Sequence, residues 1–204
     1  MNPSDMIIAG YARVAADIIA RYDEIEPEHL YKESALYFPS PPAAALDIGA
    51  GTGRDALWLA EMGFQVTAVE PVAALRDHGA GRDRRGKVSW IDDRLPKLQR
   101  LASTTDRFNL ILVNAVWQHL PKEDQVEAIG TLTRLLGERG RIILSIRHGP
   151  GACDRKVYEC DADHVVMEFE RKSVSLLSRE TRKSLQAANK ANSVSWEWLA
   201  LEKR

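Results

Sequence analysis

The feature that most constrains this chain is an apolar run, residues 43–48, that leads directly into three alternating glycines. The run ends in Asp47-Ile48-Gly49-Ala50-Gly51-Thr52-Gly53, and residues 55–62 then follow a helical pattern. Such a run is typical of a buried parallel strand, and the glycines permit a tight turn that brings backbone N–H groups close to a ligand. The helix adds the positive end of its dipole. The segment therefore predicts an α/β fold with a ligand site where the strand ends.

Two classes of ligand fit such a loop. Residues 51–56, Gly-Thr-Gly-Arg-Asp-Ala, formally match the G-x-G-x-x-A fingerprint of dinucleotide sites. In that fingerprint the first glycine directly follows the strand, and here this position is Gly49. Counted from Gly49, the sixth residue is Arg54 instead of glycine or alanine. The register therefore disfavours NAD and a nucleotide-dependent oxidoreductase.

The rest of the chain alternates between short apolar runs and helical patterns. Further strands are expected at residues 64–69, 88–91, 107–113 and 140–146, and helices at residues 4–25, 72–78, 97–102 and 122–136. This alternation predicts a doubly wound, mostly parallel sheet with helices on both faces. The last third is less regular: residues 173–177 and 194–201 are typical of strands, 162–172 fits a helix or a strand, and 180–189 has helical propensity.

Residues 45–53 resemble motif I of the class I (Rossmann-like) S-adenosylmethionine-dependent methyltransferases, and the resemblance extends over residues 43–147. It implies a seven-stranded sheet with an antiparallel C-terminal strand, which residues 194–201 fit. It also implies a single methyltransferase domain over residues 1–204. In that domain, residues 1–42 form an N-terminal helix and loop that cover the active site. Residues 43–147 form the cofactor-binding core, and residues 148–204 complete the sheet and the substrate side.

The resemblance further implies which residues bind S-adenosylmethionine. The glycine loop wraps the amino acid part and the ribose, and Asp47 orients the ammonium end. Glu70 ends the second strand, where a carboxylate is able to accept both ribose hydroxyls. An acidic residue after the third strand bonds the adenine amino group, with Asp92 better placed than Asp93, although either aspartate also suits a helix cap. The expected cofactor-binding residues are Asp47, Gly49, Ala50, Gly51, Gly53, Arg54, Glu70, Pro71, Asp92, Asp93, Asn114 and Ala115.

The substrate side is expected where the fourth and fifth strands end and where the N-terminal helix covers them. His119 is a candidate catalytic residue, and the alternative is that it holds its loop. Arg147 and His148 are suited to an acidic substrate, and an exposed polar turn is the alternative. The expected substrate-binding residues are Tyr11, Tyr22, Trp117, His119, Arg147 and His148.

The absence of two sequence motifs narrows the range of possible methyl acceptors. The fourth strand is followed neither by [DNS]-P-P-[YFW], which is usual in enzymes that methylate planar amino groups, nor by Pro-Cys, which cytosine C5 methylation requires. The formal net charge of −1 disfavours nucleic acid as the main partner. The sequence therefore favours a methyltransferase that acts on O, N, S or C of a small molecule by in-line displacement. The alternatives are a cofactor-binding regulatory or partner subunit without transfer activity, and a protein or RNA methyltransferase.

The setting is expected to be the cytoplasm. No targeting pattern is visible at the N-terminus, and no run of about 18 apolar residues suggests a membrane helix. Cys153 and Cys160 lie seven residues apart, so no thiolate zinc site and no other metal is expected, and both are predicted to be free thiols. Oligomeric state is left open.

Overall fold

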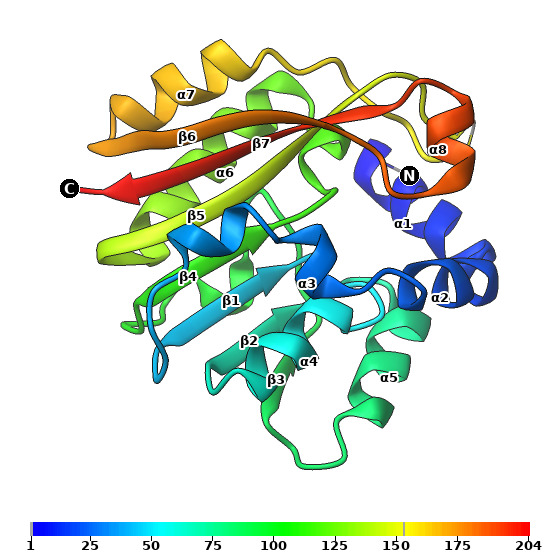
Figure 1. The fold of residues 1–204 in the computed structure, drawn as a ribbon, viewed down its shortest axis with the longest axis horizontal. Helices are drawn as coiled ribbons and strands as arrows, with labels where there is room; N and C mark the ends of the chain where they lie inside the picture. Colours follow the sequence, from blue (N-terminus) through cyan, green and yellow to red (C-terminus); the bar gives the residue numbers. More distant parts are fainter. Residues whose placement is uncertain (1, 153) are drawn as a thin grey trace.

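The computed structural model describes residues 2–152 and 154–204, so the prediction for the Cys153 thiol lies outside the described residues. Seven strands form one sheet in the order β3-β2-β1-β4-β5-β7-β6 (Figure 1). Neighbouring strands run parallel from β3 to β5, and β7 runs antiparallel to both β5 and β6. The predicted mostly parallel sheet with an antiparallel C-terminal strand is confirmed. The strands are β1 (Ala44–Ile48), β2 (Gln65–Val69), β3 (Val88–Ile91), β4 (Phe108–Val113), β5 (Leu136–His148), β6 (Val174–Lys183) and β7 (Ser195–Lys203).

Helices cover both faces of the sheet, as predicted (Figure 1). Leu46 and Ile48 of β1 join a buried cluster with α6 and α7, whereas Ala45 joins a second cluster with α3 and α4. This is the period of two that a strand buried on both faces requires. The helices are α1 (Pro3–Arg13), α2 (Ala15–Asp23), α3 (Pro27–Leu30), α4 (Arg54–Glu61), α5 (Ala73–Arg82), α6 (Lys122–Leu135), α7 (Ala162–Glu170) and α8 (Ala187–Ala191), with short 3₁₀ turns η1 (Ser34–Tyr37), η2 (Gln99–Leu101) and η3 (Trp117–His119).

The strand order reverses between β1 and β4. The chain leaves β1 toward α4 on one face, and it leaves β4 toward α6 on the other face. Ligands of open α/β sheets bind at such a switch point, outside the carboxyl ends of the strands. Figure 1 shows α1, α2 and α8 gathered at this end of the sheet, and the C-terminus at the opposite end.

The predicted single helix over residues 4–25 is wrong, because the chain breaks at Val14. Val14 has φ −115° and ψ 20°, and its N–H donates to the carbonyl of Tyr11 instead of to that of residue 10. The break turns the chain, so that α1 and α2 both contact α5. Ala15 and Ile18 of α2 cluster there with Leu75 of α5, and Ile8 of α1 packs against this cluster.

The last third also differs from the sequence prediction. Residues 162–172 contain helix α7, which settles the choice between helix and strand. β6 continues to Lys183, through part of the segment with helical propensity, because it pairs with β7 as far as the Lys183–Ser195 register position. Only α8 in that segment is helical. β5 begins at Leu136 instead of residue 140, with a register shift against β4 between Phe108 and Leu110.

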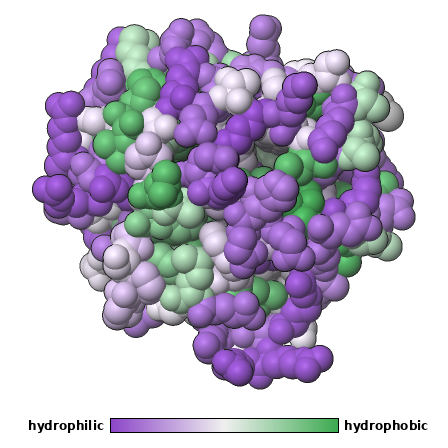
Figure 2. Space-filling model, in the orientation of Figure 1, coloured by the Kyte–Doolittle hydropathy of each residue, from purple (hydrophilic) through white to green (hydrophobic). Residues whose placement is uncertain are grey.

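The surface carries no continuous apolar face in the view of Figure 2, which is mostly hydrophilic with separate hydrophobic areas. The large exposed apolar side chains come from different elements, for example Met6 of α1, Leu36 of η1 and Met167 of α7. None of the helices in the described part of the chain combines the length and the apolarity that crossing a membrane requires.

Candidate active site at the carboxyl ends of the strands

The glycine loop between β1 and α4 has a backbone that only glycine adopts without strain. Gly49, Gly51 and Gly53 have φ of +68°, +56° and +79°. A Cβ at Gly49 would lie 2.3 Å from Cγ2 of Val116, which is part of the loop after β4. At Gly51 a Cβ would meet only ordinary contacts, with Tyr22 Cδ2 at 3.9 Å. The loop is thus packed tightly against the β4 side and less tightly against α2.

Glu70, directly after β2, fixes this loop. Its Oε2 accepts the N–H of Gly51 at 2.8 Å, and its Oε1 accepts the N–H of Val72 at 2.8 Å. The side chain is only 5% exposed. Burial raises the pKa of Glu70 above its ordinary value, against the lowering effect of the two backbone N–H groups. The carboxylate lines a cavity and holds the loop at the same time.

A smaller cavity of about 140 Å³ opens beside Glu70. Its wall is largely apolar, with Ile48, Leu95 and Val116 among the lining residues, and Pro71 and Asp93 also reach it. An apolar cleft with the Glu70 and Asp93 carboxylates at its edge suits a nucleoside, because the base needs apolar packing and the ribose needs an acceptor.

Of the two aspartates after β3, the structure favours Asp93 for this cavity, and the preference for Asp92 is not supported. Asp92 has a 55% exposed side chain, faces Arg76 at 3.4 Å and does not line the cavity. Asp93 lines the cavity, but its two oxygens accept the N–H groups of Arg94 at 2.8 Å and Arg100 at 2.7 Å. Its carboxylate therefore also stabilises the loop after β3 by accepting backbone N–H groups. This resembles the capping role that was the alternative for either aspartate.

A buried network of charges lies beneath the other side of the loop. Asp55 accepts hydrogen bonds from Arg54 Nε at 2.6 Å, Tyr31 Oη at 2.7 Å and Asn114 Nδ2 at 3.3 Å. Burial on its own would raise the pKa of Asp55, but the Arg54 guanidinium and these donors hold it below its ordinary value. Burial and the charge of Asp55 together raise the pKa of Asp47 well above its usual range. The ionised form is therefore favoured at Asp55 and disfavoured at Asp47.

Asp47 does not reach either cavity and contributes to the site only by supporting the glycine loop. The side chain is 2% exposed, lines neither cavity, and its Oδ2 has no hydrogen-bond partner among the described residues. Gly53 is also absent from the walls of both cavities, because it packs against Trp90. A Cβ at this position would lie 2.7 Å from Cη2 of Trp90. Both residues support the loop from behind.

Asn114 links this network to the loop after β4. Ser145 of β5 donates from Oγ to Asn114 Oδ1 at 3.0 Å and accepts the N–H of Ala115 at 2.8 Å. Ala115 has φ +57°, a left-handed conformation that is uncommon outside glycine. Side chains of α4 and β5 thus hold the Asn114 amide at the switch point of the sheet.

A larger cavity of about 370 Å³ lies on the side of α2, α8 and the ends of β5 and β6. It meets the smaller cavity along a shared wall to which the glycine loop, the loop after β4 and the two N-terminal helices contribute. The residues that line both cavities are Tyr11, Tyr22, Gly49, Gly51, Asn114, Ala115 and His119. The structure therefore brings together the expected residues Tyr11, Tyr22 and His119.

His119 and Tyr11 form a hydrogen-bonded pair on this shared wall. His119 Nδ1 lies 2.8 Å from the carbonyl oxygen of Lys156, which only accepts, so Nδ1 carries the hydrogen. Nε2 is then the acceptor, and Tyr11 Oη at 2.9 Å donates to it. Burial lowers the pKa of His119 below 6.5, and burial also raises the pKa of Tyr11 well above 10. Both side chains are therefore neutral at pH 7, and the basic Nε2 of His119 accepts the hydrogen bond of the Tyr11 hydroxyl.

Two expected substrate residues lie elsewhere. Trp117 has 0% exposure and packs against Phe169 of α7, because the 3₁₀ turn after β4 directs its ring into the core. His148 does not line either cavity and instead lies 2.9 Å from Glu197 Oε2 of β7. It is adjacent to Arg147 on β5, and adjacent side chains of a strand point to opposite faces. Arg147 does line the larger cavity.

Several residues that line the larger cavity were not predicted from the sequence. Asp55 carries a signal, since an acidic side chain in the first turn after a glycine loop points back toward the loop. Arg21 and Lys32 come from the N-terminal part of the chain. Further lining residues come from the irregular last third, where the end of β6 was not predicted and the side of the predicted strand 194–201 that faces the cavity was not assigned. They include Arg155, Arg182, Lys183, Asn189, Trp196 and Trp198.

The fold and the paired cavities define a nucleoside-type ligand site with an adjoining pocket, and comparison with known proteins gives the family. The model of the family described as a methyltransferase domain matches residues 19–192. An uncharacterized methyltransferase from Alkaliphilus oremlandii is 28% identical over 100 residues, which cover 49% of this chain and 44% of that protein. The chain thus matches less than half the length of this relative. It belongs to the methyltransferase domain family, and its cofactor is S-adenosylmethionine.

Solved structures share the fold. The N-methyltransferase NodS from Bradyrhizobium japonicum, in complex with S-adenosyl-L-homocysteine, has a TM-score of 0.67 at 17% identity, over 95% of this chain and 98% of that chain. The 1,6-didemethyltoxoflavin-N1-methyltransferase from Burkholderia thailandensis has a TM-score of 0.65 at 19% identity, over 100% of this chain and 91% of that chain.

The residues present fit S-adenosylmethionine. The smaller cavity offers apolar walls and the Glu70 carboxylate for the adenosine part. The glycine loop, Arg54 and Asn114 line the adjoining larger cavity, where the amino acid part would be held. Gly51 lines both cavities, so a side chain at this position would begin to fill the space for the cofactor.

Proposed function

We propose that this protein transfers the methyl group of S-adenosylmethionine to a small molecule that binds in the larger cavity. The observation that carries the proposal is the meeting of the two cavities at Tyr11, Asn114 and His119. One cavity has the apolar walls and the carboxylate for a nucleoside, and the other leaves room of small-molecule size beside it. NodS and the toxoflavin enzyme, which share the fold, are named for N-methylation, and the second is named for a small-molecule acceptor.

S-adenosylmethionine supplies a methyl group on a sulfonium, so that an acceptor lone pair forms the new bond while the sulfur keeps the electron pair of the broken bond. The protein's part is to hold the acceptor in line and to exclude water. The packed loop, with Gly49 against Val116 and with Ala115 held by Ser145, gives this edge a fixed shape.

An acceptor that is protonated at neutral pH also requires a base. The Tyr11 hydroxyl lies on the wall shared by the cavities and donates to His119 Nε2. The acceptor's proton passes to Tyr11 Oη as the Tyr11 proton passes to His119 Nε2. The His119 Nδ1–H stays on the Lys156 carbonyl, which holds the ring in the required tautomer.

Two measurements test the proposal. Isothermal titration should give S-adenosylhomocysteine binding, and no binding at millimolar concentration would contradict the proposal. A panel of small hydroxyl, amine and thiol acceptors, with S-adenosylhomocysteine release as the readout, should then give turnover. Turnover with RNA or protein alone would overturn the small-molecule acceptor, and cofactor binding without turnover on any acceptor would identify a regulatory subunit.

The base is tested by the pH profile. Because the pKa of His119 is lowered below 6.5, kcat/KM should fall only as the pH drops below that value. His119→Gln should lower kcat by about 10²–10⁴-fold and flatten this acid limb. Tyr11→Phe should lower kcat with little change in S-adenosylhomocysteine affinity. An unchanged acid limb in His119→Gln would assign His119 to holding the loop.

A further inference from the structure

The larger cavity has an excess of positive charge that the chain as a whole does not have. Seven lysine or arginine side chains and two carboxylates, Asp55 and Glu33, line it, whereas the whole chain has a net charge of −1. Both carboxylates already face lining arginines: Asp55 lies 2.6 Å from Arg54, and Glu33 lies 3.2 Å from Arg182. The excess of five positive charges therefore has no counterpart on the cavity wall.

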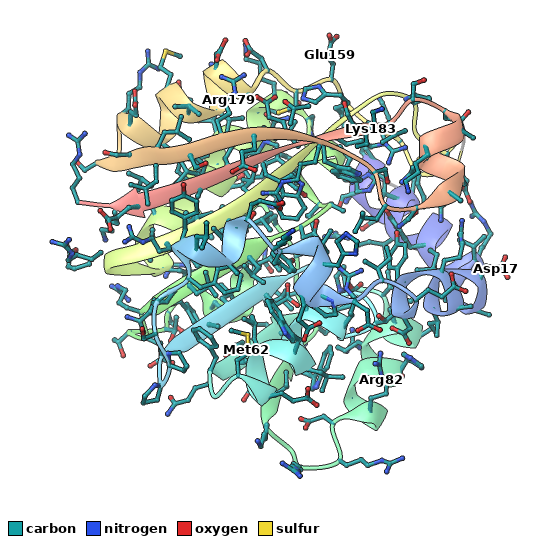
Figure 3. All side chains as sticks on the ribbon, in the orientation of Figure 1. Asp17, Met62, Arg82, Glu159, Arg179 and Lys183 are labelled. Atoms are coloured by element: carbon teal, nitrogen blue, oxygen red, sulfur yellow. The ribbon has the colours of Figure 1, made fainter. Side chains whose placement is uncertain are left out.

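Four of these cations form no salt bridge with any residue that the structure describes. They come from α2, from the turn after α3 and from the ends of β5 and β6, so they surround the cavity from several sides. They are Arg21, Lys32, Arg147 and Lys183. Figure 3 places Lys183 where β6 leads into α8, whereas Arg179, on the same strand, lies beside α7.

Arg147 is the cation whose side chain is held in place by several contacts. The guanidinium is half-buried, and its Nε and Nη2 donate to the carbonyl of Pro150 at 3.2 and 2.5 Å. Nη2 also donates to Asn189 Oδ1 at 3.1 Å, and the carbon at the centre of the group lies 5.5 Å from the Trp196 ring centroid. These contacts hold a planar cation in place with Nη1 unbonded to any described residue. A fixed guanidinium with a free N–H edge matches a carboxylate or a phosphate.

The position of Arg147 separates it from the cofactor's own carboxylate. Arg54 follows the glycine loop directly and lines the cavity where the amino acid part of the cofactor would be held. Arg147 and Lys183 come from β5 and β6, and Trp196 of β7, which pairs with Arg147, provides aromatic surface beside the guanidinium. We infer that the acceptor is a small molecule that carries a carboxylate or a phosphate group, bound by Arg147 with Lys183 at the rim. This inference rests on the proposed function.

The test uses protein saturated with S-adenosylhomocysteine and two pairs of probes that differ in charge, benzoate against benzamide and phenyl phosphate against phenol. Isothermal titration should give at least tenfold tighter binding for the anion of a pair, and binding should weaken with added salt. The tighter of the two anions identifies the group. Equal binding of charged and neutral probes, or no binding of either anion at millimolar concentration, would overturn the inference.

Variants localise the effect. Arg147→Gln should weaken anion binding at least tenfold, whereas Lys190→Gln, which removes an equal charge from an exposed position on α8 outside the cavity, should change it less than twofold. Lys183→Gln, at an exposed side chain, should weaken binding two- to fivefold without affecting the fold. Equal effects of Arg147→Gln and Lys190→Gln would contradict a local site.

The same titrations distinguish the two proposals. Anions that displace S-adenosylhomocysteine instead of binding with it would assign these cations to the cofactor's carboxylate and would overturn the inference alone. Loss of S-adenosylhomocysteine binding itself, in the absence of any anion, would contradict the proposed function.

Discussion

The two cavities are built in different ways although they share a wall. The smaller one is centred on the glycine loop and the ends of β2 and β3, with α1 and the loop after β4 completing its wall, and the loop's shape depends on backbone: left-handed glycines and N–H groups held by Glu70. The larger one combines α1, α2, β5, β6 and β7, and its character depends on long charged side chains. A backbone-built site tolerates little change, whereas a side-chain-built site is able to change specificity while the fold stays intact.

The largest expected effect is at Asp55, where the larger cavity reaches the buried network. Arg54 and Asp55 have side-chain exposures of 14% and 8%. Asp55→Ala leaves the Arg54 charge buried without a partner, so we expect a loss of about 3–5 kcal/mol in the free energy of unfolding, measured with urea at pH 7. Asp17→Ala, on the outer side of α2 (Figure 3), is the control and should change stability by less than about 0.5 kcal/mol.

The pH dependence of this loss is a second readout of the same variant. The folded-state pKa of Asp55 lies below its ordinary value of 3.8, so its stabilisation is present above that value and is lost as the pH falls through the folded-state pKa. The difference between wild type and Asp55→Ala should therefore shrink in acid. A difference of less than 1 kcal/mol at pH 7 would contradict a buried ion pair at this position.

The second prediction separates two glycines of one loop. Gly49→Ala combines a left-handed φ, which costs about 1–2 kcal/mol, with overpacking against Val116, which costs about 1–3 kcal/mol. Gly51→Ala has only the first cost, because its Cβ meets ordinary contacts. Gly49→Ala should thus lose more stability than Gly51→Ala in urea unfolding, and Gly51→Ala should lose S-adenosylhomocysteine affinity while staying folded. The reverse order would contradict the packing of this loop against the β4 side.

This contrast also explains how far the sequence was informative. The glycine loop, Glu70 and Asn114 were predicted because a strand, a tight turn and a strand end leave local signals in residue type and spacing. Trp117 was misplaced, because a single 3₁₀ turn decides whether its ring faces the core or the pocket. Arg155 was missed, because it lies in the connection between β5 and α7, for which no element was predicted. Lys183 was missed, because its position depends on where β6 ends, which the long pairing of β6 with β7 determines. No local pattern in the chain encodes that pairing.

The smallest expected effect is at Asp23, the residue by which α2 holds the glycine loop. Its Oδ1 accepts from Thr52 Oγ1 at 2.7 Å and from Arg82 Nη1 at 2.8 Å, and its Oδ2 lies 3.0 Å from His78 Nε2. Burial acts to raise the pKa of Asp23, but the bonds from Thr52 and His78 and the charge of Arg82 lower it below 3.8. Because these partners are partly exposed, Asp23→Asn should cost only about 1 kcal/mol or less.

This cost should appear above pH 4 and vanish as the pH falls through the lowered pKa of Asp23, where the wild-type carboxylate is also protonated. Because Asp23 connects a helix of the larger cavity to the loop that both cavities share, Asp23→Asn should also weaken S-adenosylhomocysteine binding severalfold in isothermal titration. Asp17→Asn on the same helix should leave both quantities unchanged. Weaker binding at unchanged stability would still support a connection between the two cavities, whereas unchanged binding would show that the glycine loop keeps its shape without α2.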